Sequence, residues 1–476
     1  MTSGLKLALG AHVAAHILLH AALLTPPSVL SRVRLATLAL PAIWALHLHT
    51  WNLGLGYVAA VHALWATELL LFRNPRQDFA VLHSGDPSRP PTEDRKTSAS
   101  VHRRDDKVDE ALENITAAID ETKARARAKS VANGSHRIAW AEPYPQDLWN
   151  RFLWVSKLVL SLRYIGWSTS PSQTVLYSSQ PPLGSAKSRA SFVRQQLFHI
   201  GLCIGIMDVA NFYQYFDPYF QIDTSIDENF PRRLAGFFAR NHLSFLSPRF
   251  VRISCLMLQQ YSVLSLVGAI PAVLFVSLGA LGLVGDFWGR VESWPSIMGS
   301  PLAIAHRGLR GLWGATWHQL FRNILVGPGR AVARVLKLPE HSTAAYAIRV
   351  AVAFAISSAL HSATLPSGVP GISPLRYASF FWVQGACVLY EMALVKAAGR
   401  LGLMGPRPDW LELALALART VWTGFVLYHT VPVVEDELTR KVVRRPELKA
   451  YSMGLKSRFI LSFQSGVEIL ESCLIV

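Results

Sequence analysis

Long apolar runs dominate the distribution of hydrophobic and polar positions along this chain. Segments close to twenty residues long and almost free of charge occur at 7–24, 35–50, 53–72, 195–216, 253–282, 350–365, 377–399 and 411–433. A helix needs about 20 apolar residues to cross roughly 30 Å of hydrocarbon, and lipid requires every spanning segment to satisfy its own backbone hydrogen bonds. The pattern predicts an all-α, polytopic membrane protein with about eight transmembrane helices. The two shortest runs, 35–50 and 350–365, allow tilted, interfacial or flank-extended helices as alternatives.

Composition agrees with a membrane location. Of the 476 residues 51% are hydrophobic and only 16% are charged, whereas soluble domains carry about 25% charged residues. The net charge of +16 would suit nucleic acid, but basic loops facing the cytoplasm and anionic lipid give a membrane protein the same excess. We therefore expect the lipid bilayer as a partner and no nucleic acid. No C-x-x-C spacing links the four cysteines, so neither a disulfide framework nor a zinc site is indicated.

The apolar runs divide the chain into four parts. A three-span membrane segment at 1–72 precedes a polar, partly disordered cytoplasmic insert at 73–190, a membrane-bound core at 191–433 and a basic tail at 434–476. Within the insert, apolar residues at i, i+4, i+7 and i+11 predict a short helix from Val108 to Ile119. Basic residues between the first two runs place the amino terminus in the lumen and the insert in the cytoplasm. Counting the crossings in order places the tail in the lumen, although its basic residues favour the cytoplasm. One crossing is therefore miscounted.

Histidines concentrate in the first three apolar runs. His12, His16 and His20 are spaced at i, i+4 and i+8 on one helical face, and the next two runs contain His47, His49 and His62. Stacked imidazoles could bind a metal. No carboxylate accompanies them in the first run, so we favour cavity lining or helix–helix hydrogen bonds and predict no metal site.

The densest chemical motif lies at 294–323, which reads WPSIMGSPLAIAHRGLRGLWGATWHQLFRN. It resembles the Trp-Pro-x-x-x-Gly-Ser and Leu-Arg-x-x-Trp-Gly-x-x-Trp-His-Gln elements of the wax-synthase-like membrane-bound O-acyltransferases, in particular the fungal terpenoid acetyltransferase branch. Ala315 and Thr316 depart from the family's bulky or basic pair. The resemblance spans about 160–433, which makes 191–433 the acyltransferase core. One weaker part of the resemblance is Arg163–Trp167, where Tyr164 replaces a glycine. The other weaker parts are Ser357, Ser358, His361, Gln384, Gly385, Glu391, Thr430, Val431 and Pro432.

The resemblance implies roles for two histidines. Acyl transfer to a hydroxyl needs a base for the alcohol proton and hydrogen-bond donors for the oxyanion, and a neutral histidine suits the first task near pH 7. His361 lies twelve residues after Arg349, about 18 Å along a helix. An ionisable group so deep in an apolar run is costly, which suggests a functional role. We assign the base to His361 and orientation of the acyl carbonyl to His318. A satisfied hydrogen bond between helices is the alternative for His361, and a pocket wall or an interfacial aromatic belt is the alternative for His318.

A donor site for coenzyme A is expected beside these histidines. Arg310 and Arg322 suit phosphate groups because guanidinium donates two parallel hydrogen bonds, although basic residues facing anionic lipid give the same pattern. Trp317, Gln319 and Asn323 complete the predicted binding set.

The predicted function is acyl-CoA-dependent O-acyl transfer. We expect acetyl-CoA as co-substrate with no permanently bound cofactor, a lipophilic terpenoid or meroterpenoid alcohol of secondary metabolism as acceptor, and a multi-pass location in the endoplasmic reticulum. A long-chain wax ester synthase is the alternative enzyme. A membrane transporter, with Asp208 and Glu391 in a relay, and a catalytically inactive scaffold are the non-enzymatic alternatives.

Overall fold

A computed structural model describes residues 3–49, 56–84, 138–169, 189–220, 224–363, 365, 373–403, 405 and 407–443. Each of the eight apolar runs coincides with a helix over most of its described residues, so the predicted all-α membrane class is confirmed. The corresponding helices are α1 (Ser3–Leu24), α2 (Arg32–His49), α3 (Gly56–Thr67) with η2 (Glu68–Phe72), α8 (Arg189–Phe216), α10 (Pro248–Ala280), α15 (Thr343–Ser362), α16 (Pro374–Arg400) and α17 (Asp409–Val443).

Five of these helices are long and apolar enough to cross a bilayer. They are α1, α10, α15, α16 and the part of α17 from Asp409 to Glu437. Helices α2, α3 and α8 fall outside that set, and the total of about eight crossings stays a prediction. The helix expected around residues 108–119 lies outside the described residues.

Shorter elements connect the long helices. They are α4 (Pro75–Asp78), β1 (Val81–Ser84), β2 (Ile138–Glu142), α6 (Leu148–Val159), η3 (Pro218–Phe220), α9 (Arg232–Arg240), α11 (Asp286–Gly289), η4 (Val291–Ser293), α12 (Leu302–Arg307), α13 (Leu309–Gly311), η5 (Leu312–Thr316) and α14 (Arg322–Val335).

Serine caps fix where three of the long helices begin. Ser247, Ser342 and Ser373 precede α10, α15 and α16, and each hydroxyl accepts a hydrogen bond from the backbone N–H three residues on, at 3.1–3.2 Å. Pro248 and Pro374 follow two of these caps, at the helix position where proline's missing N–H costs nothing. The start of α15 is thereby set upstream of the apolar run that predicted it.

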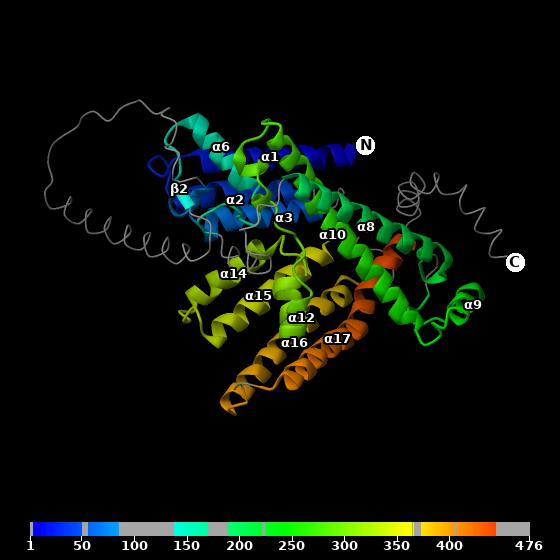
Figure 1. The fold of residues 1–476 in the computed structure, drawn as a ribbon. Helices are drawn as coiled ribbons and strands as arrows, with labels where there is room; N and C mark the ends of the chain where they lie inside the picture. The colour runs from blue at the N-terminus through cyan, green and yellow to red at the C-terminus, as the bar shows by residue number, and fades with distance from the viewer. Residues whose placement is uncertain are drawn as a thin grey trace, which may run out of the picture.

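The amino-terminal helices share a core with the two ends of the polar segment 73–190. Strands β1 and β2 pair antiparallel, with Val81 opposite Glu142, and α6 packs against α1 (Figure 1). The indole N–H of Trp65 donates to the carbonyl of Val159 at 3.0 Å, and Trp154 is fully buried. The described parts 73–84 and 138–169 of this segment are therefore folded onto the amino-terminal helices.

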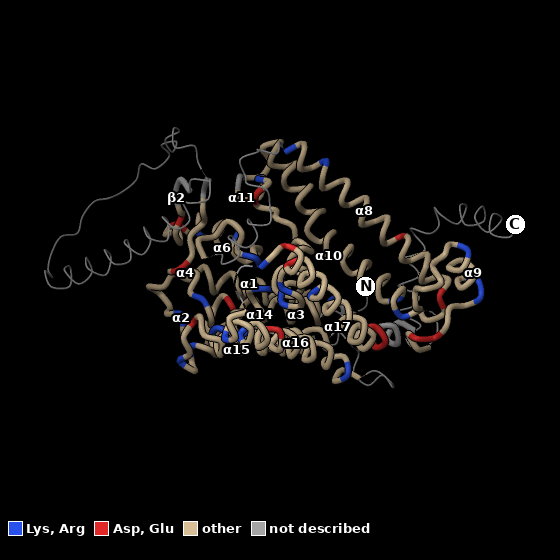
Figure 2. Tube along the Cα trace, turned by 60° about the horizontal axis from the view of Figure 1, so that its bottom comes forward, with Lys and Arg blue, Asp and Glu red and all other residues tan. Residues whose placement is uncertain are grey.

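Helices α8 and α10 lie side by side and expose an apolar surface (Figure 1). Long stretches of both carry no charged residue, and the basic residues of this region gather at helix ends and on α9 (Figure 2). Leu258, Val267 and Ile270 of α10 are 50–54% exposed. Contiguous apolar exposure on this scale is unfavourable in water and favourable in lipid, which agrees with an integral membrane protein.

Helices α14 to α17 form the part of the molecule that carries the site. Helix α15 packs between α14 and α16, and α17 packs against α16, α10 and α12 (Figure 1). Helix α17 continues ten residues past position 433, where the core was expected to end.

The clustered histidines contact one another across α1, α2 and α3. Nε2 of His47 lies 2.8 Å from Nδ1 of His62, and the rings of His12 and His16 have centroids 5.2 and 4.0 Å from that of His62. The His47–His62 contact is a helix–helix hydrogen bond of the kind favoured from the sequence. Among the residues that the structure describes, no group of three or more His, Cys, Asp or Glu is arranged to hold a metal ion.

Candidate active site

The two halves of the motif at 294–323 bind each other directly. The N–H of Gly299 donates to the carbonyl of Thr316 at 2.8 Å, and the N–H of Gln319 donates to the carbonyl of Ile297 at 2.9 Å. A Cβ at position 299 would lie 1.8 Å from the carbonyl oxygen of Ala315, a distance that no side chain tolerates. Glycine at 299 therefore permits the backbone contact that sets the position of the Trp-His-Gln segment.

Arg163 ties the upstream element to the same motif. Its guanidinium donates to the carbonyls of Pro295 at 2.7 Å and Ser296 at 3.0 Å. Tyr164, which stands where the resembled family has glycine, adopts a φ of +52°. This left-handed conformation favours glycine. Tyr164 therefore has the backbone conformation that a glycine at this position would adopt easily.

A change of helix geometry places His318 beside α15. Residues Leu312–Thr316 form a π-helical turn, and Trp317 then becomes extended, so the chain leaves the helix one residue before His318. π-Helical turns are rare and are frequent at functional sites. The indole N–H of Trp313 donates to Gln384 at 3.0 Å, and the amide of Gln384 donates to Thr430 at 2.7 Å, which fixes this turn to α16 and α17.

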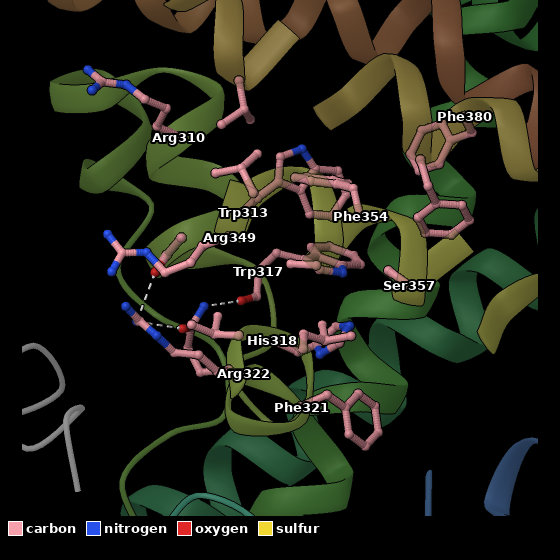
Figure 3. A pocket seen from close by; sticks show the side chains of 18 of the residues that line it. Arg310, Trp313, Trp317, His318, Phe321, Arg322, Arg349, Phe354, Ser357 and Phe380 are labelled. Carbon is pink, nitrogen blue, oxygen red and sulfur yellow. Dashed lines mark hydrogen bonds between the residues drawn. The ribbon is translucent and has the colours of Figure 1, made fainter. Parts of the chain in front are cut away.

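A cavity of about 960 Å³ lies between η5, α10, α14, α15, α16 and α17. Arg310, Arg322 and Arg349 lie on one side of it, and Phe354 and Phe380 lie on the other, with His318 between them (Figure 3). The lining also includes Tyr57, Arg307, Trp313, Trp317, Gln319, Arg330, Ser357, His361, Tyr377, Phe381, Val431 and Glu435. Arg349 and His361 are about 18 Å apart along α15, so the cavity extends from a basic end to an aromatic end.

His361 faces this cavity from the last turn of α15. Its Nδ1 lies 2.8 Å from the carbonyl oxygen of Ser357. A carbonyl can only accept, so Nδ1 carries the proton and Nε2 carries the lone pair. The ring packs against Phe381, with centroids 4.7 Å apart, and against Tyr57 at 5.8 Å. This tautomer is the one that a general base requires.

His318 has a buried ring nitrogen without a hydrogen-bond partner in the described part of the chain. This nitrogen is Nδ1. Burial, and secondarily the proximity of His361, lowers the pKa of His318 to about 4, so the imidazole is neutral at pH 7. An unsatisfied buried polar atom costs about 1–3 kcal/mol, and a substrate carbonyl would remove that cost by accepting a hydrogen bond.

Some of the residues predicted to bind coenzyme A line the cavity, and one of them instead joins two segments of the fold. Trp317 and Gln319 line the cavity, and the side-chain oxygen Oε1 of Gln319 accepts a hydrogen bond from Arg322 at 3.1 Å. Asn323 does not line it: its side chain donates to the carbonyl of Leu162 at 2.8 Å, which joins α14 to the segment after α6.

The arginines at the basic end are incompletely neutralised. Burial, followed by repulsion from Arg307, lowers the pKa of Arg322, and burial, followed by repulsion from Arg73, lowers that of Arg330. Arg310 has Glu391 at 3.8 Å. A carboxylate-poor group of half-buried guanidiniums favours an anionic ligand.

Tyr57 and Glu435 are among the lining residues that sequence reasoning missed. Tyr57 comes from α3, in the amino-terminal segment, and Glu435 comes from the part of α17 that was assigned to the tail. Both belong to segments that the motif does not include, so no local signal marked them.

Part of this chain matches a known family and several known proteins. Residues 294–382 match the membrane bound O-acyl transferase family. The acetyltransferase ataH of Aspergillus terreus is 44% identical over 160 residues, which are 33% of this chain and 50% of that protein. The acetyltransferase eriL of Hericium erinaceus is 26% identical over 297 residues, 60% of this chain and 66% of the relative. An acetyltransferase of Arthrobotrys oligospora is 27% identical over 233 residues, 47% of this chain and 44% of the relative.

These matches confirm the predicted resemblance to the fungal acetyltransferase branch of the membrane-bound O-acyltransferases. The matched segment 294–382 contains both His318 and His361. The chain spans about half the length of two of these relatives. No solved structure matches it.

Proposed function

We propose that this chain is a membrane-bound O-acyltransferase that transfers an acetyl group from acetyl-CoA to the hydroxyl of a lipophilic alcohol. The observation that supports this most is one cavity that brings His318 and His361 together between a basic end and an aromatic end. Phosphate-bearing coenzyme A suits the arginines, and an apolar alcohol suits the aromatic side chains. The thioester and the hydroxyl would then meet at the histidines.

The proposed reaction needs no group beyond the two substrates. Nε2 of His361 takes the proton of the alcohol as its oxygen attacks the thioester carbon, and His318 donates a hydrogen bond to the oxyanion. Collapse of this intermediate breaks the C–S bond, and the leaving thiolate takes the proton from His361. The products are the ester and free coenzyme A.

A polycyclic terpenoid or meroterpenoid alcohol is the proposed acceptor. A cavity of about 960 Å³ lies at the upper end of the size range of ligand pockets, and the relatives that match are named acetyltransferases. We propose the endoplasmic reticulum as the location, because the protein is an integral membrane protein with an apolar acceptor.

Labelled acyl donors test this function. Membranes containing the protein should transfer label from acetyl-CoA to a polycyclic alcohol, with product mass increased by one acetyl group. Transfer only from palmitoyl-CoA would favour a wax ester synthase, and no transfer from either donor, in the presence of correctly folded protein, would contradict the proposal.

The transporter alternative has less support in the structure. Asp208 is exposed on α8 and does not line the cavity. Glu391 accepts hydrogen bonds from the N–H groups of Leu309 and Arg310 at 2.9 and 3.0 Å, so its carboxylate holds the turn that carries Arg310. The two acids are therefore not assembled into a relay.

We expect Arg310→Ala to raise the KM for acetyl-CoA about tenfold or more, with a smaller effect on the KM for the alcohol. A charge-assisted hydrogen bond is worth about 1.5–3 kcal/mol, and Arg310 lies at the basic end of the cavity. Initial rates at varied concentrations of each substrate give both constants. Arg232→Ala is the matched control, because Arg232 is exposed on α9. Equal effects on both substrates would contradict a role for Arg310 in donor binding.

A further inference from the structure

Glu435 is a buried carboxylate that borders the cavity. Its side chain is 6% exposed and lines the cavity together with the aromatic residues. No hydrogen bond or ion pair joins it to another described residue. Placing a carboxyl group in an apolar interior without a partner is costly, so this position suggests a ligand that supplies one.

The neighbouring charged residues satisfy one another instead. Arg376 lies 3.6 Å from Asp436 and 3.7 Å from Glu437. Glu437 also accepts a hydrogen bond from the N–H of Ser373 at 2.8 Å, and Asp436 accepts one from Tyr219 at 2.9 Å. In this acidic run of α17, Glu435 is the member that lines the cavity.

Two tyrosines extend the same polar region toward His361. Tyr57 and Tyr377 line the cavity, and Tyr377 packs in one cluster with Val431 and Val434, which lie four residues and one residue before Glu435 on α17. Neither phenol has a hydrogen-bond partner among the described residues. The ring of Tyr57 lies 5.8 Å from that of His361, and Tyr377 is one helical turn, about 6 Å, from the Phe381 that packs on His361.

We propose that Glu435, Tyr57 and Tyr377 form a second polar subsite, which binds a hydrogen-bond donor on the acceptor alcohol away from the hydroxyl that is acylated. The inference rests on the proposed function, because it takes the cavity as an acyl-acceptor site. A carboxyl oxygen accepts a hydrogen bond whether the group is ionised or neutral. The substrate class is therefore a polycyclic alcohol with a second hydroxyl or an amine on a distal ring, rather than a simple mono-ol or a fatty alcohol.

Three steroid acceptors with one ring skeleton test the subsite. The first has a single hydroxyl, the second has another hydroxyl on the distal ring, and the third has an amine there. Purified wild-type protein should acetylate the diol or the amino-alcohol with a kcat/KM about ten- to a hundredfold above that of the mono-ol, because the mono-ol leaves a buried acceptor without its hydrogen bond. Glu435→Leu should bring this ratio close to one. Glu435→Gln should keep part of the preference for the diol and lose that for the amino-alcohol.

Asp436→Asn is the matched control. It removes a charge from the adjacent position without changing the cavity lining, so it should keep the wild-type ratio of kcat/KM values. Because the readout is a ratio within one preparation, a lower yield of folded variant does not affect it. A wild-type protein that acetylates the mono-ol as well as both other acceptors, or a Glu435→Leu variant that keeps the preference, would overturn the subsite.

A binding measurement separates the subsite from the proposed function. Thermal stability of the detergent-purified protein, measured with each steroid and without acyl-CoA, reports binding alone. A larger stabilisation by the diol or the amino-alcohol than by the mono-ol, lost in Glu435→Leu, would support the subsite even if no acetyl transfer occurred. Acetyl transfer without any such difference in binding or rate would refute the subsite and leave the acyltransferase function standing.

Discussion

Replacing His361 with alanine is expected to lower kcat by about 10²- to 10⁴-fold, the usual effect of losing a general base. Nδ1 of this residue is held by the carbonyl of Ser357 at 2.8 Å, so Nε2 is the atom that would accept the alcohol proton. His318 and Glu435 line the same cavity, and His318 is assigned to the acyl carbonyl in the proposed reaction, so His361→Ala tests the base separately. The rate of acetyl transfer at saturating substrate measures the effect.

His429→Ala is the control for this prediction. His429 is a histidine of a membrane-spanning helix that is exposed on α17 and does not line the cavity, so its loss should leave kcat near the wild-type value. Size-exclusion chromatography of both variants in detergent reports folding and insertion. A His361→Ala variant that is monodisperse and keeps more than about half of the wild-type rate would remove His361 as the base.

Helix positions were predictable because a single physical requirement determines them. Lipid excludes unpaired backbone groups, so an apolar run of the right length has essentially one structure available. The predicted runs 7–24 and 195–216 end at Leu24 and Phe216, where α1 and α8 end. Helix α15 begins at Thr343, seven residues before the predicted run 350–365, because Ser342 caps the helix upstream of that run. Hydropathy does not report a cap that lies in a polar flank.

Side-chain partners inside the site were harder to predict. The motif placed Trp317, His318 and Gln319 together because they are consecutive, and the structure places all three in the lining of the cavity. Asn323 belongs to the same stretch, but one turn of α14 directs it to the carbonyl of Leu162 instead. A resemblance identifies the segment, whereas the orientation of each side chain depends on the local helix geometry.

Residues from distant segments could not be predicted at all. Tyr57 and Glu435 meet at the cavity although 378 positions separate them in the sequence. Their contribution depends on how α3 and α17 pack around α15 and α16. Packing between membrane helices follows from shape and small residues more than from hydropathy, so a single sequence carries little information about it.

Substitutions of His318 should distinguish a donor to the acyl carbonyl from a residue that only fills space. We expect His318→Asn to be slow but measurable, and His318→Leu to lose about a further 10²- to 10³-fold in kcat, the usual cost of removing one oxyanion donor. The reason is that asparagine keeps an N–H at similar reach, whereas leucine keeps the volume without a donor. Because burial lowers the pKa of His318 to about 4, the neutral imidazole is the form that both substitutions replace.

The order of the two variants decides the role of His318. If the residue is a pocket wall, leucine is the better replacement, because burying the polar amide of asparagine without a partner costs about 1–3 kcal/mol. If it is a donor, asparagine is better, because Nδ1 of His318 lacks a partner among the described residues and a substrate oxygen would supply one. Measuring kcat for both variants in parallel, with the amount of folded protein matched, gives opposite orders for the two roles. A leucine variant equal to or faster than the asparagine variant would exclude His318 from the chemical step.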